Sequence, residues 1–277
     1  MAMYDKVVCF IGLAVFMGYT AYDTQMIKRY HAATLTDPDM AHKGAILCAL
    51  QLYLDFCGYS WMAIGVGEML GFRLPRNFEH PYAARSMRDF WRRWHISLSS
   101  WFRDYVYIPL GGSKKGEGRT YLNLLVVWLF TGLWHGSTLN FLLWGLFLFA
   151  LISLERLGWG KVLRRSQVIS RLYMLLVIPL SWMLFAIPSL KDIGSYIGRL
   201  FAFSGGTAVH ARDFLVYGRQ YAVVLVIGLL VSTPLPEKLW LRIRTSPLGT
   251  VLLLVLFWVC VYCMAVATND PFMYFSF

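Results

Sequence analysis

The sequence predicts an all-α, polytopic membrane protein with about seven transmembrane helices and one amphipathic helix at the membrane interface. Of its 277 residues, 58% are hydrophobic, 17% are aromatic and only 15% are charged. A soluble domain usually carries about 25% charged residues. Several apolar runs approach or exceed the roughly 20 residues that cross a bilayer. Because backbone groups at that depth must be hydrogen-bonded within their own segment, we interpret these runs as helices.

The apolar runs follow one another along the chain with polar connections between them. They cover residues 7–22, 44–70, 120–135, 138–154, 172–190, 220–233 and 247–268. Only a Gly-Ser pair separates the run 120–135 from the run 138–154, so we expect these two to form a helical hairpin. Five cysteines lie inside apolar runs and show neither metal-ligand spacing nor a disulfide pattern.

The net charge of +11 falls mainly in the connections between apolar runs. This distribution favours cytoplasmic loops that set the topology, and it argues against a nucleic-acid partner. We place the basic connections 71–119 and 155–171 on the cytoplasmic side. The connection 191–219 is also basic, which conflicts with simple alternation and leaves the orientation after residue 190 open.

The most informative stretch is SMRDFWRRWHISLSSWFRDYVYIPL, residues 86–110. Its aromatic and aliphatic residues recur at helical spacing on one arc, with arginines on the flanks. Such a basic, Trp-rich pattern is typical of a helix that lies in the membrane interface. Pro109 and the pair Gly111-Gly112 are expected to end it.

Two histidines stand out as candidate functional residues. His95 falls at the edge of the apolar arc, where it could simply form the polar boundary of the helix. His135 lies in TGLWHGSTLNF, between two apolar runs. Ionisable residues at membrane depth suggest function, and histidine suits proton transfer near neutral pH. A histidine that hydrogen-bonds to the connecting turn is the alternative.

The string RDFWRRWHISLSSWFRDYVYIPLGG, followed by TGLWHG, closely resembles the membrane-bound O-acyltransferase family, and most of all its alginate O-acetyltransferase branch. The resemblance runs from about residue 50 to the C-terminus. It implies a multi-pass protein of the bacterial plasma membrane that passes an activated acyl group to a hydroxyl acceptor. The family's histidine pair maps onto His135, as the general base, and His95.

The resemblance also implies ligands and partners. The substrate-binding candidates beside the histidines are Arg92, Arg93, Trp94, Arg103 and Asp104. We expect no metal and no tightly bound cofactor, with acetyl-CoA as a candidate acyl donor. The expected partners are membrane lipid and, as acyl acceptor, a polysaccharide or a periplasmic or extracellular acetyltransferase.

Residues 1–55 resemble a second family, the bacterial Bax-inhibitor-type membrane proteins. The motifs AYDTQ and LYLDF place two of that family's aspartates at Asp23 and Asp55, a pair that could share a proton. We therefore divide the chain into a segment 1–55 and an acyltransferase portion 56–277. Two alternative functions follow, namely a proton-sensitive cation leak or an inactive remnant. Trp61 strengthens the second, since the acyltransferase pattern favours Asp there.

Overall fold

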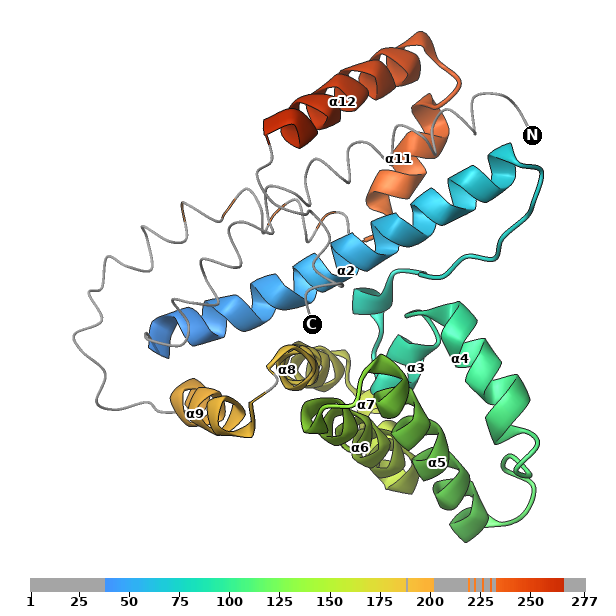
Figure 1. The fold of residues 1–277 in the computed structure, drawn as a ribbon, viewed down its shortest axis with the longest axis vertical. Helices are drawn as coiled ribbons and strands as arrows, with labels where there is room; N and C mark the ends of the chain where they lie inside the picture. The colour runs from blue at the N-terminus through green and yellow to red at the C-terminus, as the bar shows by residue number, and fades with distance from the viewer. Residues whose placement is uncertain are drawn as a thin grey trace. The chain divides into compact units, whose positions relative to one another are not determined.

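A computed structural model describes residues 38–187, 189–201 and 233–266, with four single positions between 219 and 230. Side chains are described from Leu52 onward, with some exceptions that include Asp55. All regular structure in these residues is helical, which confirms the predicted class. The described chain forms two compact units, one drawn from residues 1–76 and 199–277 and the other from residues 77–198 (Figure 1). The predicted run 7–22 lies outside the described residues.

The first unit contains one long helix and a helical pair. Helix α2 (Pro38–Met69) begins earlier than the predicted run 44–70. Helices α11 (Leu235–Ile243) and α12 (Pro247–Val266) meet at a tight turn. Arg76 reaches the Glu237 carboxylate at 3.4 Å and lies 5.7 Å from the centre of the Trp61 ring. Trp61 therefore provides a surface for a cation, where the acyltransferase pattern favours Asp.

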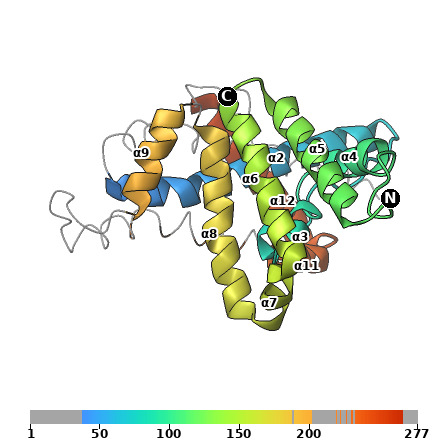
Figure 2. The ribbon, with the colours of Figure 1, turned by 90° about the horizontal axis from the view of Figure 1, so that it is seen from below.

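The second unit is built on three antiparallel helices. Helices α5 (Glu117–His135) and α6 (Leu139–Leu154) form the predicted hairpin, and α6 lies between α5 and α8 (Gln167–Ala186) (Figure 2). The α5 and α6 backbones approach closely because Gly145 lies against the carbonyl oxygen of Trp128. Asn140 donates from Nδ2 to the carbonyl of Phe185 at 2.9 Å, which joins the start of α6 to the end of α8.

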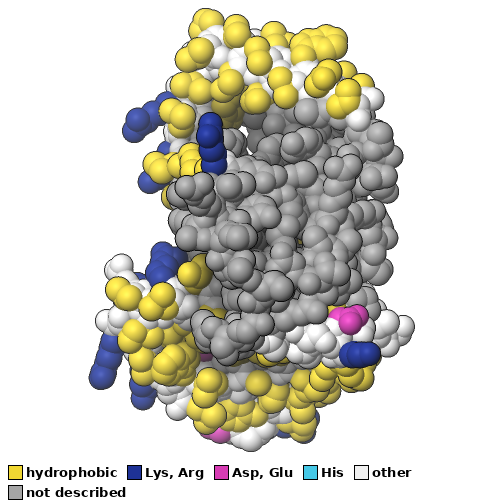
Figure 3. Space-filling model, turned by 90° about the vertical axis from the view of Figure 1, so that its left-hand side faces the viewer, with side chains coloured by type: hydrophobic (Ala, Val, Ile, Leu, Met, Phe, Trp, Pro, Cys, Tyr) yellow, Lys and Arg dark blue, Asp and Glu magenta, His cyan; other side chains and the backbone are white. Residues whose placement is uncertain are grey.

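Large apolar side chains cover much of the described surface (Figure 3). Phe130 of α5 and Leu175 of α8 are 55% and 64% exposed. Such outward-facing apolar side chains are typical of helices that contact lipid. Among the described residues, the segments Leu139–Arg165 and Gln167–Ala186 are long and apolar enough to cross a membrane. The part of the chain that is described thus supplies two of the seven expected spans.

The single helix predicted over residues 86–110 is wrong. The segment forms α3 (Met87–Trp91), α4 (Ile96–Phe102) and a π-helical turn η2 (Arg103–Tyr107), with a sharp break at His95. His95 has left-handed backbone angles, φ 45° and ψ 55°. Asn77 makes this break favourable, because its backbone carbonyl accepts the N–H of Ile96 and its side chain accepts that of Ser97. The N-terminal amides of α4 are therefore capped from a distant part of the chain.

Two connections predicted as loops also contain helices. Residues 155–171 include the π-helical turn η3 (Glu155–Trp159) and α7 (Gly160–Arg165), and residues 191–219 begin within α9 (Leu190–Phe201). A short 3₁₀ turn, η1 (Pro81–Ala83), precedes α3. These segments are polar on one side only, so their basic residues reach solvent while the opposite side packs. Leu163 of α7 and Ile193 of α9, for example, are buried.

Candidate functional site

Helix α3 and the turn directly after it carry Arg88, Arg92 and Arg93 of the basic motif, and contacts distant in sequence hold the helix in place. The Ser86 hydroxyl caps it by accepting the N–H of Asp89. The buried carboxylate of Glu155 accepts the N–H of Met87 at 2.6 Å and that of Arg88 at 3.1 Å. The Tyr173 hydroxyl of α8 donates to the same carboxylate at 3.1 Å. Glu155 therefore fixes the start of α3 against α6 and α8.

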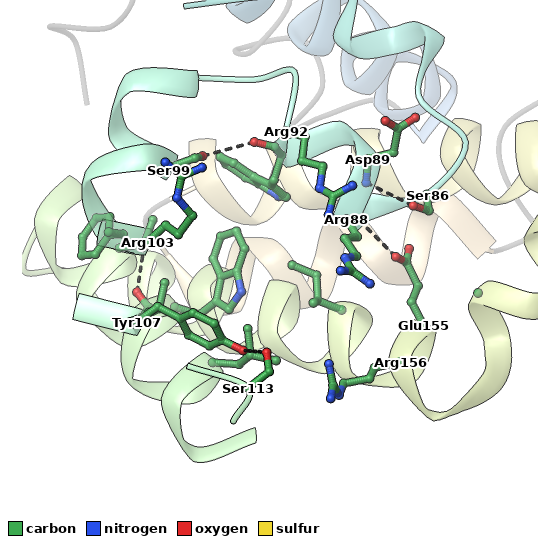
Figure 4. A pocket seen from close by; sticks show the side chains of 18 of the residues that line it. Ser86, Arg88, Asp89, Arg92, Ser99, Arg103, Tyr107, Ser113, Glu155 and Arg156 are labelled. Carbon is green, nitrogen blue, oxygen red and sulfur yellow. Dashed lines mark hydrogen bonds between the residues drawn. The ribbon is translucent and has the colours of Figure 1, made fainter. Parts of the chain in front are cut away.

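A cavity of about 880 Å³ lies between α3, α4, η2, α5 and the α6–α7 region. Figure 4 shows the side chains that surround this space, namely Arg88 of α3, Arg92 just after it, Tyr107 and Ser113 from the region of η2, and Glu155 and Arg156 of η3. The cavity begins near the N-terminal end of α5, where Arg156 pairs with Glu117 at 2.9 Å. It continues along α5 as far as Thr131.

The cavity wall is strongly cationic. Six arginines line it against two carboxylates, Asp89 and Glu155. Two of the six pair with acids outside the wall, Arg103 with Asp104 and Arg156 with Glu117. The other four are Arg85, Arg88, Arg92 and Arg164. None of these four forms an ion pair with a described residue. The cavity can therefore bind a ligand that carries several negative charges, such as phosphate groups.

Asn77 also fixes the ring of His95. The Asn77 Oδ1 atom accepts the backbone N–H of Ser97 at 3.2 Å, which identifies it as the carbonyl oxygen. It lies 3.2 Å from Nδ1 of His95. Because an amide oxygen can only accept, Nδ1 must carry the proton and the lone pair lies on Nε2. Burial lowers the pKa of His95 to about 4, so the ring is neutral at physiological pH.

The low pKa of His95 predicts a loss of stability on mild acidification. The unfolded chain binds a proton at this residue below about pH 6.5, whereas the folded protein does not until about pH 4. Wild type should therefore lose stability relative to His95→Asn as the pH falls through this interval. Asn is chosen because it tolerates the left-handed backbone at this position. The free energy of unfolding can be measured by titrating detergent-solubilised protein with dodecyl sulfate at several pH values. If wild type and His95→Asn differ in this free energy by the same amount at every pH, the low pKa of His95 is contradicted.

His135 lies at the C-terminal end of α5 among aromatic rings. The ring centres of Trp144 and Phe185 lie 5.1 Å and 5.0 Å from its own, both edge to face. Trp134 is near both histidines, with its ring centre 4.9 Å from that of His135 and 6.0 Å from that of His95. Past His135, Ser137 and Thr138 of the α5–α6 turn are exposed. His135 is thus shielded on several sides yet adjoins a turn that reaches solvent.

The other predicted site residues have different environments. Arg92 and Arg103 line the cavity. Arg93 pairs with Asp89 at 2.9 Å, and Trp94 is buried against Phe90 and Trp182. Asp104 is exposed, and its hydrogen bond with Arg103 lowers the pKa of its carboxyl group. Asp23 and the side chain of Asp55 lie outside what the structure describes, so the carboxylate pair stays a prediction.

Sequence reasoning missed the roles of Asn77 and Glu155. Asn77 lies in a polar connection with no periodic pattern of its own. One feature of the sequence does indicate a role for Glu155, namely its position directly after the apolar run 138–154. An acid at that position points to a buried or interfacial partner. Nothing in the local sequence indicates that the partner is the backbone of residues 87 and 88, because any residue presents the same N–H group.

The structure thus defines an all-helical protein with apolar candidate membrane spans and a basic cavity. The profile of the MBOAT, membrane-bound O-acyltransferase family matches residues 6–194, and the chain belongs to this family. The match includes most of residues 1–55, whose separate origin stays a prediction.

Curated relatives carry acetyl-transfer names. The chain is 33% identical over 282 residues to a probable alginate O-acetylase AlgI of Pseudomonas putida, an alignment that covers 92% of this chain and 57% of the relative. It is 39% identical over 213 residues to the probable alginate O-acetylase AlgI of Pseudomonas aeruginosa, covering 76% and 41%. A peptidoglycan O-acetyltransferase of Helicobacter pylori is 36% identical over 176 residues, covering 60% and 33%. The chain therefore spans about half or less of the length of these relatives.

Proposed function

We propose that this chain transfers an acetyl group from an anionic donor, such as acetyl-CoA, to a hydroxyl group of an extracellular polysaccharide resembling alginate or of a partner acetyltransferase. The observation that carries the proposal is the position of His135 one helical turn beyond the end of an arginine-lined cavity. The names of the relatives support acetyl as the acyl group and a polysaccharide as acceptor.

The two ends of the α5–α6 hairpin suit the two substrates. At one end, Arg156 and Arg164 line the cavity near the exposed basic residues Lys161 and Arg165, which supports a cytoplasmic position for this end by the positive-inside rule. An activated donor with phosphate groups is available there. At the other end, the exposed α5–α6 turn lies next to His135. An acceptor hydroxyl group from the outer side can approach the histidine at this turn.

The reaction needs one proton transfer and one acyl transfer. A neutral ring nitrogen of His135 takes the proton of the acceptor hydroxyl while its oxygen attacks the acyl carbonyl carbon. The bond between that carbon and the donor sulfur then breaks, and the sulfur leaves as a thiolate or takes up the proton. The tautomer of His95 suits its Nε2 atom to accept a hydrogen bond rather than to polarise a carbonyl group. His95 is therefore better suited to orient the acceptor hydroxyl, or the thiol of coenzyme A once the acyl group has been transferred.

The arginine wall supports the donor assignment, and Arg92→Gln tests it. Removing one charge-assisted contact to a phosphate should raise the KM for acetyl-CoA about ten- to a hundredfold. We expect kcat to change little, because the contact is made equally in the ground state and the transition state. The assay is transfer of radiolabelled acetyl groups by full-length protein in proteoliposomes with alginate as acceptor.

Arg165→Gln is the matched control, since Arg165 is an exposed arginine of α7 that adjoins the wall residue Arg164. It should leave the KM unchanged. If both substitutions raise the KM equally, general electrostatic attraction accounts for the effect and the cavity is not the donor site. If wild type transfers no acetyl group to alginate or to a partner acetyltransferase, the proposed function is wrong.

A further inference from the structure

The arginine-lined cavity and His135 are separated by a wall of aromatic rings. Thr131 lines the cavity, and His135 follows it on α5 four residues later, about 6 Å along the helix axis. The ring centre of Trp91, also in the cavity wall, lies 5.7 Å from that of Trp144. Trp144 in turn lies 5.1 Å from His135. Trp91 and Trp144 therefore form a row of rings that runs from the cavity wall to the histidine.

The two tryptophans differ in how firmly they are held. Trp144 is fully buried, and its indole N–H donates to the hydroxyl of Ser181 at 3.0 Å. Trp91 is 7% exposed, and its indole N–H has no hydrogen-bond partner among the described residues. No polar contact with a described residue therefore fixes the Trp91 ring in its present position. A buried N–H group without an acceptor is also unfavourable in free energy. Of the two tryptophans, Trp91 is the one whose ring is held by packing alone.

We propose that Trp91 is a specificity-determining residue that closes the passage from the cavity to His135 and limits the acyl group to a small one. Its ring contacts that of Trp128 at 5.0 Å as well as that of Trp144. The backbone of Trp128 cannot shift towards α6, because it already lies against Gly145 at the close contact of α5 with α6. A larger acyl group must therefore displace Trp91 further than an acetyl group does. This inference rests on the proposed donor site.

The test compares acetyl-CoA with butyryl-CoA on full-length protein in proteoliposomes. Each added methylene group in a closed apolar passage changes discrimination by about tenfold or more. Wild type should prefer acetyl-CoA, and Trp91→Leu should raise the butyryl-to-acetyl ratio at least tenfold, both in equilibrium binding of the radiolabelled donors and in acyl transfer. Trp91→Phe, which perturbs packing less, should raise the ratio by a smaller factor.

Trp159→Leu is the matched control. Trp159 also has a buried indole N–H without a described partner, but its ring packs on Tyr173 rather than in the wall. The butyryl-to-acetyl ratio of Trp159→Leu should equal that of wild type. If Trp91→Leu and Trp91→Phe bind both donors with the wild-type ratio, Trp91 does not set acyl size and the inference is wrong. Because binding is read separately, an absence of transfer by wild type would refute the proposed function while the binding ratio still decides the role of Trp91.

Discussion

Replacing His135 by alanine is expected to lower acyl transfer by about a hundred- to ten-thousandfold, the range that general-base catalysis supplies. The substitution removes the ring that packs against those of Trp144 and Phe185 at the end of α5. Donor affinity should stay near the wild-type value, because the donor contacts lie one turn or more away along the cavity. The loss should therefore appear in kcat, measured with acetyl-CoA at saturation.

Two further variants separate catalysis from packing. His135→Gln preserves a polar side chain of similar length and should be as inactive as His135→Ala while unfolding at nearly the wild-type midpoint. Ser137→Ala, on the same exposed turn, should keep full activity. Wild-type rates in a folded His135→Gln protein would show that another group removes the proton.

Replacing Glu155 by alanine is expected to destabilise the second unit by about 2–4 kcal/mol. The change leaves the backbone N–H groups of Met87 and Arg88 and the Tyr173 hydroxyl without their acceptor. Each buried donor left unpaired costs roughly 1–3 kcal/mol, and water from the adjoining cavity offsets part of this cost. Because α3 and its C-terminal end position Arg88 and Arg92, the affinity for acetyl-CoA should fall as well. Unfolding midpoints and equilibrium donor binding measure the two effects.

Glu117→Ala provides the comparison for Glu155. Glu117 pairs with Arg156 at the same end of the hairpin, but its side chain is 70% exposed. An exposed ion pair contributes about 1 kcal/mol or less, so this variant should unfold close to wild type. Equal destabilisation by both substitutions would mean that charge at this end of the hairpin, rather than the fixing of α3, determines stability.

Local sequence patterns predicted those parts of the structure that depend on residues close to one another in the sequence. The hairpin of α5 and α6 follows from two apolar runs with a very short link, and the helical class follows from apolar composition. The periodicity of residues 86–110 was misleading, because a helical pattern of buried residues continues across the break at His95. Met87, Phe90, Trp91 and Trp94 are all buried within the unit rather than at a membrane surface.

The sequence by itself determined that this protein is helical and membrane-bound, and its motifs identified the family and both candidate histidines. Only the tertiary structure decided the shape of the site. The bonds that define it join residues far apart, such as Asn77 with His95, 18 positions away, and Glu155 with Met87, 68 positions away. Glu155 binds backbone amides, which every residue type except proline presents, so no side-chain pattern encodes the contact. The placement of Trp91 between the arginines and His135 likewise exists only once α3, α5 and α6 have packed.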